Sequence, residues 1–168
     1  MQRFSFEQLF SALPSPHMVL DRNLNFVAVN AAYETATMSR REALVGQNLF
    51  DVFPNQGEAG HRLRQSIAEV LRTGKPDTIA YIEYDIPRPA DAGGGFERRY
   101  WTAVHSPLRD ADGAVVYVLQ NTVDITELVS LRLAASLPFQ TLPGERELLE
   151  RAREVEAAYQ IANDQTRE

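Results

Sequence analysis

The sequence of 168 residues contains no cysteine, which excludes disulfide bonds, thiolate metal sites and catalysis by a cysteine nucleophile. It also lacks long apolar runs, because its unbroken apolar stretches are far shorter than a membrane-spanning helix. The N-terminal segment Met1–Glu7 has no apolar stretch of the kind found in signal peptides. Together these absences predict a cytoplasmic protein.

Clustered positive charge is absent as well. The formal net charge is −6, and acidic and basic residues are interleaved along the chain. Because there is no basic stripe, neither nucleic acid nor an anionic membrane is an expected partner.

The sequence offers few candidate residues for catalysis or for metal binding. The three histidines have no metal-ligand spacing, and the glycines at 93–95 lack the lysine and following helix of a phosphate-binding loop. No histidine has a kinase-type phosphoacceptor setting. A small-molecule enzyme would need a perturbed acid, for which Glu83 and Asp85 are the candidates. We therefore predict no catalytic residues and no metal site.

What the sequence does contain is an ordered series of strand and helix patterns. Segments rich in β-branched and aromatic residues are bounded by turn residues, and one helical block separates the second of them from the third. This order predicts an α+β fold with a five-stranded antiparallel sheet. The predicted strands are 17–21, 25–29, 78–86, 96–107 and 114–123, with an exposed loop at 87–95 and a hairpin turn at 109–113.

Predicted helices start where a capping residue is followed three positions later by Glu or Gln. The pairs with this spacing are Ser5/Gln8, Ser39/Glu42, Asn55/Glu58 and Asp124/Glu127. Asn30 is a further candidate cap, and Gly74 ends the longest helix of the block.

The joint at Asp124 carries the strongest functional signal. The last strand ends at Asp124–Thr126, and Asp124 and Glu127 have the spacing to cap each other's backbone amides. A strand would then pass into a helix without a flexible loop, so that strain in the sheet reaches whatever the helix drives. This is the mechanism of a sensor, with Asp124, Thr126 and Glu127 as relay residues.

The tail beyond this joint predicts two helices. A short amphipathic helix covers 127–137, and Pro138 and Pro143 then interrupt the chain. Apolar residues with 4-3-4-3 spacing follow, which indicates either a short coiled coil or a helix packed on its own domain. Two further alternatives are that this second helix folds back, or that it pairs in a domain-swapped dimer. The seam residues are Leu148, Ala152, Val155, Tyr159 and Ala162.

The order of these segments resembles the PAS sensory domains of bacterial signalling proteins, over about Phe6 to Glu127. The residues that carry the resemblance are Asp21–Asn30, Ser39–Gly46, Leu49–Pro54, Tyr84–Pro89, Tyr100–Trp101, Ser106–Gly113 and Asp124–Thr126. The resemblance implies a flanking helix at 1–14, a PAS domain at 15–126 with short helices over one face of the sheet, and linker helices at 127–168. It also implies an output domain outside this chain, such as a histidine kinase.

The resemblance further implies that a ligand would lie between the sheet and the helices. Strand alternation gives Tyr100, Thr102 and Val104 one shared face, and Val118 and Gln120 another, and both faces are expected to look inward. The opposite wall would consist of Tyr33, Phe53, Ile67 and Leu71. A few polar groups in an apolar cavity suit a small-molecule ligand. The alternative is a filled core without a ligand.

No cofactor is expected, and haem or non-covalent flavin are the alternatives. Flavin photochemistry of the light-oxygen-voltage type needs a reactive cysteine, which is absent. Haem needs an inward axial ligand, but His61 points away from the apolar face of its helix. His105 shares a face with Trp101 and Ala103, which we interpret as the outer face of the sheet.

That outer face would expose an apolar patch, which predicts a homodimer. The predicted interface combines the first helix with the sheet, through Phe6, Leu9, Phe10, Leu13, Trp101 and Leu119. The sequence thus predicts a sensory and dimerisation module, with a haem or flavin redox sensor or a ligand-free adaptor as alternatives.

Overall fold

The computed structural model describes residues 5–135. The contacts divide the chain after Asp124 into two units, which are described separately. None of the helices in the described part is both long and apolar enough to span a membrane.

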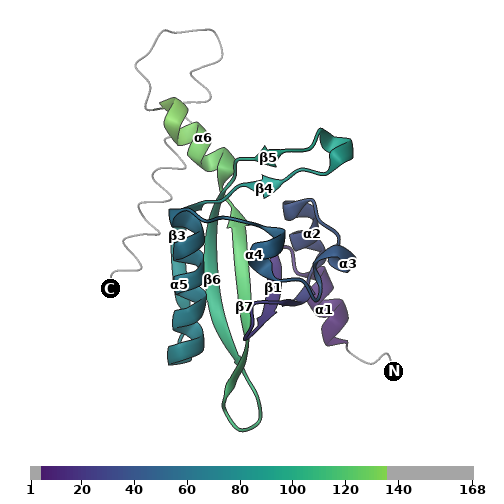
Figure 1. The fold of residues 1–168 in the computed structure, drawn as a ribbon, viewed down its shortest axis with the longest axis vertical. Coiled ribbons are helices and arrows are strands. Elements are labelled where there is room, and N and C mark those ends of the chain that lie inside the picture. The colour runs from purple at the N-terminus through teal and green to yellow at the C-terminus, as the bar shows by residue number, and fades with distance from the viewer. Residues whose placement is uncertain (1–4, 136–168) are drawn as a thin grey trace. The chain divides into compact units, whose positions relative to one another are not determined.

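The first unit is built on a five-stranded antiparallel sheet (Figure 1). Its strands lie in the order β2-β1-β7-β6-β3, which places β7 at the centre. This central strand pairs with β1 on one side and with β6 on the other. The strands are β1 (His17–Asp21), β2 (Phe26–Val29), β3 (Asp77–Glu83), β6 (Tyr100–Arg109) and β7 (Val115–Asp124).

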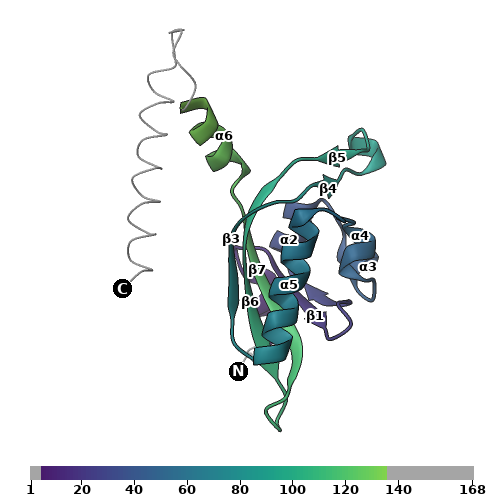
Figure 2. The same cartoon turned by 60° about the vertical axis from the view of Figure 1, so that its left-hand side comes forward.

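Helices of the block between β2 and β3 cover one face of the sheet (Figure 2). They are α2 (Ala31–Thr37), α3 (Arg41–Leu44), α4 (Leu49–Val52) and α5 (Glu58–Thr73), and α1 (Phe6–Ala12) precedes the sheet. The hydrophobic core lies between the sheet and these helices, because Met18, Leu20 and Val118 of the sheet and Ile67 of α5 are all fully buried. The predicted α+β class and five-stranded sheet are confirmed.

Local capping explains where several helices begin. The Ser5 hydroxyl accepts a hydrogen bond from the Gln8 amide at 3.3 Å, and Asn30 Oδ1 accepts one from the Tyr33 amide at 2.9 Å. Gly74 ends α5 at a φ of +64°, and its amide donates to Val70. A left-handed residue of this kind is a common helix terminus and favours glycine.

Two of the predicted capping boxes are wrong in detail. The helix predicted from Ser39 begins at Arg41, and the Ser39 hydroxyl instead donates to the Thr37 carbonyl. The helix predicted from Asn55 begins after Gly57, although Asn55 Oδ1 still accepts from the amides of Gly57 and Gly60. Side-chain bonds to nearby backbone compete with capping, which shifts these boundaries.

The strand predicted at 78–86 is split. β3 ends at Glu83, and the chain then forms a two-stranded hairpin of β4 (Ile86–Pro87) and β5 (Phe96–Glu97). A 3₁₀-helix, η1 (Ala90–Ala92), lies within the predicted loop. Because Pro87 lacks an amide hydrogen, it cannot extend the hydrogen-bonded ladder, which helps to keep this hairpin short.

A β-bulge reverses the predicted face of β6. Arg109 pairs with Val115 but Leu108 pairs with Tyr117, so Val116 has no partner on β6. A regular hairpin would have put Val104 opposite Gln120, whereas the bulge puts His105 there. A one-residue shift moves every residue beyond it to the other face.

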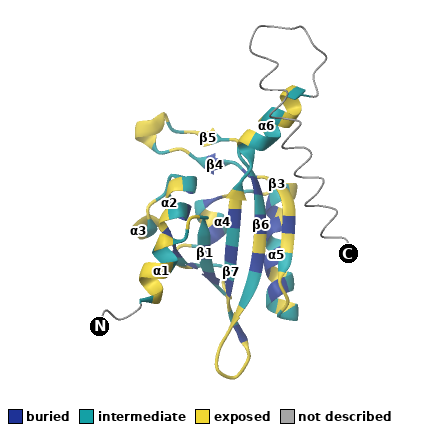
Figure 3. Ribbon diagram, turned by 180° about the vertical axis from the view of Figure 1, so that it is seen from behind, coloured by how far each residue is buried: buried dark blue, intermediate teal, exposed yellow. Residues whose placement is uncertain are grey.

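The inner face of β6 therefore carries Trp101, Ala103 and His105, which are 6%, 3% and 0% exposed. The expectation that Tyr100, Thr102 and Val104 look inward is wrong, and so is the outward assignment of Trp101 and His105. Buried residues alternate with more exposed ones along β6 and β7 (Figure 3). The inward face predicted for Val118 and Gln120 on β7 is correct, because both are buried.

The described part of the second unit is helix α6 (Thr126–Ala135), close to the predicted span of 127–137. The Ser130 hydroxyl donates to the carbonyl of Thr126 at 2.8 Å. The coiled-coil residues predicted beyond Pro143 lie outside the described residues.

Candidate functional site

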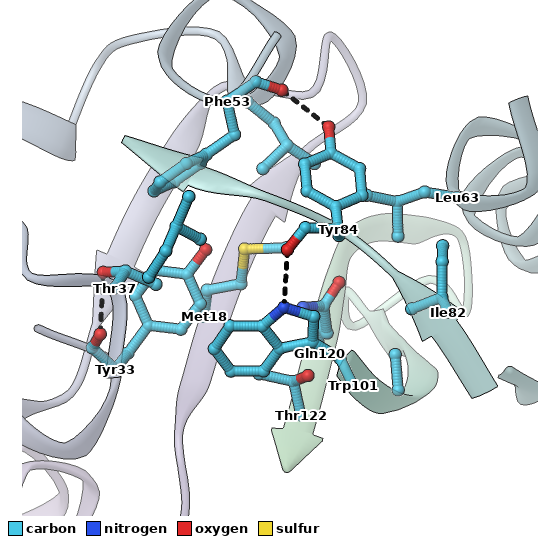
Figure 4. A pocket seen from close by; sticks show the side chains of 13 residues that line it. Met18, Tyr33, Thr37, Phe53, Leu63, Ile82, Tyr84, Trp101, Gln120 and Thr122 are labelled. Carbon is cyan, nitrogen blue, oxygen red and sulfur yellow. Dashed lines mark hydrogen bonds between the residues drawn. The ribbon is translucent and has the colours of Figure 1, made fainter. Parts of the chain in front are cut away.

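A cavity of about 60 Å³ lies between the inner face of the sheet and the helices (Figure 4). Its wall draws residues from α2, α4, α5, β1, β3, β4, β6, β7 and the segments beside them. The lining residues are Met18, Tyr33, Thr37, Leu49, Phe53, Leu63, Ile82, Tyr84, Ile86, Trp101, Ala103, Gln120 and Thr122. This volume accommodates a few water molecules or a small ligand.

The wall of the cavity is held together by two buried hydrogen bonds. The Trp101 indole donates to the Tyr84 carbonyl at 3.0 Å, and the Tyr84 hydroxyl donates to the Phe53 carbonyl at 2.6 Å (Figure 4). Burial raises the pKa of Tyr84 to about 12, so the phenol keeps its proton and remains a donor. These bonds connect β6, the segment after β3 and the end of α4.

Most of the other polar groups on the wall are also occupied. Thr37 Oγ1 donates to the Tyr33 carbonyl at 2.8 Å, and Thr122 Oγ1 donates to the Thr102 carbonyl at 2.6 Å. The Tyr33 hydroxyl and the Gln120 amide nitrogen have no hydrogen-bond partner among residues 5–135. Burial raises the pKa of Tyr33, so its hydroxyl is also protonated.

These two groups define what the cavity can recognise. Tyr33 enters the wall from α2 and Gln120 from β7, and no charged side chain is among the residues of the wall. An apolar cavity with a few directed polar groups suits a small uncharged molecule.

The structure places the predicted pocket residues in three groups. Tyr33, Phe53 and Gln120 line the cavity. Ile67, Leu71 and Val118 belong to the core around it but not to its wall. Tyr100, Thr102 and Val104 are on the opposite face of the sheet, as described above. Trp101, predicted as a dimer contact, is instead a cavity residue.

A second polar group that the sequence analysis missed lies next to the cavity. His105 is fully buried, with Nδ1 2.7 Å from Ser66 Oγ and Nε2 2.8 Å from Gln120 Oε1. The Ser66 hydroxyl is also hydrogen-bonded to the carboxylate of Asp77. Burial lowers the pKa of His105, while the Gln120 hydrogen bond and the Asp77 charge act in the opposite direction.

The three residue types of a serine hydrolase occur here in a different order. In a catalytic triad the histidine lies between the acid and the serine. Here Ser66 lies between Asp77 and His105, and it is not among the residues that line the cavity. A buried serine without access to a substrate cannot act as a nucleophile, so this group is not a hydrolytic site.

Haem does not fit the histidines of residues 5–135. Both ring nitrogens of His105 are engaged, and this side chain does not line the cavity. His17 Nδ1 is 2.8 Å from the Ser15 carbonyl, and His61 is exposed, as its helical position predicts. Within the same residues, no group of three or more His, Asp or Glu side chains could hold a metal ion.

The predicted relay residue Asp124 belongs to a chain of ion pairs. Its carboxylate is paired with Arg99, which also pairs with Glu97 at 2.7 Å, and Glu97 pairs with Arg88 at 3.2 Å. Burial opposes the charge of Arg99, but its hydrogen bonds to Asp124 and Glu97 prevail and raise its pKa. The hydrogen bond from Arg99 in turn lowers the pKa of Glu97. The end of β7 is thereby connected to β5 and to Arg88, the residue that follows β4.

The first unit is thus an α+β domain in which a five-stranded antiparallel sheet and its covering helices line a small cavity. Comparison with sequence families matches residues 10–130 to the PAS fold family. The chain therefore belongs to the PAS family, whose domains are sensory modules rather than catalytic ones.

Solved structures share this fold at low sequence identity. A PAS domain from Colwellia psychrerythraea is 15% identical with a TM-score of 0.58, over 71% of this chain and 93% of that one. A PAS domain from a two-component sensor histidine kinase is 18% identical with a TM-score of 0.51, over 70% and 91%. The LOV domain of a blue-light activated histidine kinase from Erythrobacter litoralis is 23% identical with a TM-score of 0.53, over 68% and 98%.

Proposed function

We propose that this domain senses a small uncharged molecule in its cavity and passes the signal along β7 to helix α6. One observation carries the proposal: Gln120 and Thr122, both on β7, line the cavity, and β7 ends at Asp124. Helix α6 begins at Thr126, so that a single residue, Ile125, separates it from the strand. A ligand that displaces the wall of the cavity therefore acts on the strand that leads to the helix.

Asp124, Thr126 and Glu127 are the relay residues of this proposal. The ion pairs of Arg99 with Asp124 and Glu97 fix the end of β7 to β5, so a shift of β7 must strain or break them. Thr126 and Glu127 open the helix that follows. The capping of Glu127 by Asp124 remains a prediction.

A histidine kinase outside this chain is the proposed output. Its support is the PAS family itself and the fold shared with PAS domains of sensor kinases. In a longer protein that contains the output domain, Asp124→Ala or Thr126→Ala should uncouple autophosphorylation from the stimulus without unfolding the domain. Asp112→Ala, in the exposed turn between β6 and β7, is the matched control. A normal response in both relay variants would contradict the relay.

We further propose that the domain is a homodimer through α1 and the outer face of the sheet. Phe6 and Leu9 on α1 are 79% and 47% exposed, and Tyr117 and Val123 on β7 are 39% and 43% exposed. Leu119 is half-buried on the same outer face. Apolar side chains exposed in this number favour a protein contact.

A ligand-free interaction module is the second candidate. It is favoured by the small volume of the cavity and by the internal hydrogen bonds of most of its polar groups. Native mass spectrometry of the purified protein separates the two functions. A reproducible extra mass supports ligand sensing, whereas a dimer at the bare polypeptide mass supports the interaction module. A bare monomer contradicts the dimer.

A further inference from the structure

A chain of four hydrogen-bonded side chains runs through the core from α5 and β3 to the cavity. It consists of Asp77, Ser66, His105 and Gln120, in that order. Ser66, His105 and Gln120 are 5%, 0% and 7% exposed, so water competes little for their hydrogen bonds. Gln120 is at once the end of this chain and a residue of the cavity wall.

Within the described residues, Asp77 is the charged group that acts on His105. It lies on β3, directly opposite His105 in the β3–β6 ladder. From the other elements packed against the imidazole, α5 contributes Ser66 and β7 contributes Gln120, neither of which titrates. The proton content of the chain is therefore decided by the imidazole and the carboxylate.

Each protonation state of this chain fixes the direction of its hydrogen bonds. With His105 neutral and Asp77 ionised, Ser66 donates to Asp77, so the imidazole must donate from Nδ1 to Ser66. Its Nε2 then carries a lone pair, which needs a donor from Gln120. The amide group of Gln120 would face His105, and the amide oxygen would face the cavity.

One added proton reverses the orientation of the Gln120 side-chain amide. A protonated Nε2 is a donor and needs an acceptor, which is the position that Oε1 of Gln120 occupies in this structure. The same holds if the proton resides on Asp77, because Ser66 then donates to Nδ1 and the hydrogen of the imidazole moves to Nε2. In both cases the Gln120 NH₂ group faces the cavity, where it has no partner among the described residues.

We propose that protonation of the Asp77–Ser66–His105 chain sets the orientation of the Gln120 amide and thereby switches the cavity from a hydrogen-bond acceptor to a donor. This inference rests on the proposed function, in that the cavity is the sensory site. The deprotonated domain favours ligands that donate a hydrogen bond at Gln120, and the protonated domain favours ligands that accept one. Ligand sensing is then coupled to pH.

The decisive experiment measures the tautomer of His105 in the ligand-free protein. Ring-nitrogen NMR shifts of ¹⁵N-histidine-labelled protein distinguish the Nδ1–H, Nε2–H and charged forms, and the exposed His61 provides an internal reference. We expect the Nδ1–H tautomer at high pH, the charged ring at low pH, and a change in the Gln120 side-chain amide signal at the same midpoint. A neutral Nε2–H tautomer, or a Gln120 signal that ignores the titration, would overturn the proposal.

Asp77→Asn tests the direction in which the side chains from Asp77 to Gln120 donate their hydrogen bonds. The introduced side-chain amide can donate to Ser66, which then donates to Nδ1, so His105 should hold the Nε2–H tautomer with the Gln120 signal fixed at every pH. Asp112→Asn in the exposed turn is the matched control. Should Asp77→Asn not fold, Ser66→Ala removes the link to Asp77, and the neutral ring should again change to Nε2–H. A persistent Nδ1–H form in either variant contradicts the proposal.

Two neutral probes of similar size separate this inference from the proposed function. Cyclopentanone only accepts a hydrogen bond, and pyrrole donates one through its N–H. In NMR titrations at one pH below and one pH above the midpoint found for His105, which burial places below the ordinary histidine pKa, the ratio of their affinities should change severalfold in favour of cyclopentanone at the lower pH. An unchanged ratio contradicts the switch. If neither probe binds while the amide still turns, the sensory site fails and the switch stands.

Discussion

His105 and Gln120 lie directly opposite each other on β6 and β7, with Nε2 of the imidazole 2.8 Å from Oε1 of the amide. Directly opposed residues of an antiparallel pair share one face of the sheet. The register that turns Gln120 toward the cavity therefore also buries His105 beside it. The polar end of the cavity and the buried hydrogen-bond chain are consequences of the same pairing.

The first prediction is that His105 makes stability depend on pH. Its pKa is lowered by burial, so between its folded value and the ordinary value near 6.5 the unfolded chain binds more protons than the folded one. The free energy of unfolding should therefore fall as the pH is lowered through and below 6.5, by at most about 1.4 kcal/mol per pH unit. Urea denaturation between neutral and mildly acidic pH measures this slope.

The control for that measurement is a pair of variants. His105→Gln should lose the slope in this interval even if it is less stable at every pH, whereas His61→Gln should keep it, because His61 is exposed. A slope that survives in His105→Gln would assign the effect to other groups.

The fold could be predicted from the sequence because its signals are local. Ser5, Asn30 and Gly74 act at their own helix ends, and each does so in the structure. The inner face of β7 also follows from alternation within a single strand. These elements were predicted correctly, whereas the local signals at Ser39 and Asn55 gave helix starts that were too early by about two residues.

The cavity could be predicted only in part, because its composition depends on pairing between strands. The unpaired residue Val116 shifts β6 by one position relative to β7. The inward assignment of Tyr100, Thr102 and Val104 came from the resemblance to PAS domains, and it left Trp101, Ala103 and His105 on the wrong face. The signal that could have corrected the error is Trp101 itself, since a large aromatic side chain is more favourable in the core than Thr102.

The second prediction concerns the hydrogen bond between Tyr84 and Phe53 in the cavity wall. Tyr84→Phe removes the donor and leaves the buried Phe53 carbonyl unpaired, which should lower the free energy of unfolding by about 1–3 kcal/mol. Tyr117→Phe is the matched control, because Tyr117 is 39% exposed on the outer face, and it should change stability by less than about 0.5 kcal/mol. Equal losses in the two variants would contradict the role of this bond.

The third prediction is that filling the cavity abolishes binding. Ala103 lines the cavity, so Ala103→Val should prevent binding of cyclopentanone and pyrrole while the protein remains folded. Thr102→Val introduces the same residue type at the adjacent position on the outer face of the sheet, and it should leave binding unchanged. NMR titration with both probes gives the result, and undiminished binding in Ala103→Val would place the probes elsewhere on the domain.

The fourth prediction is that the ion pair between Arg99 and Asp124 stabilises the end of β7 more than a surface pair would. The side chains are 20% and 27% exposed, so solvent screens their charges only in part. A double-mutant cycle with Arg99→Gln and Asp124→Asn should give a coupling free energy of about 1–2 kcal/mol.

The neighbouring pair of Arg98 and Glu83 is the control: its atoms are 3.0 Å apart, but its side chains are 67% and 45% exposed. Its coupling should be below about 0.5 kcal/mol, because exposed pairs contribute little. A coupling below about 0.5 kcal/mol for Arg99 and Asp124 as well would mean that Asp124 is not held by its partner, and that a shift of β7 meets no resistance where the strand leads into α6.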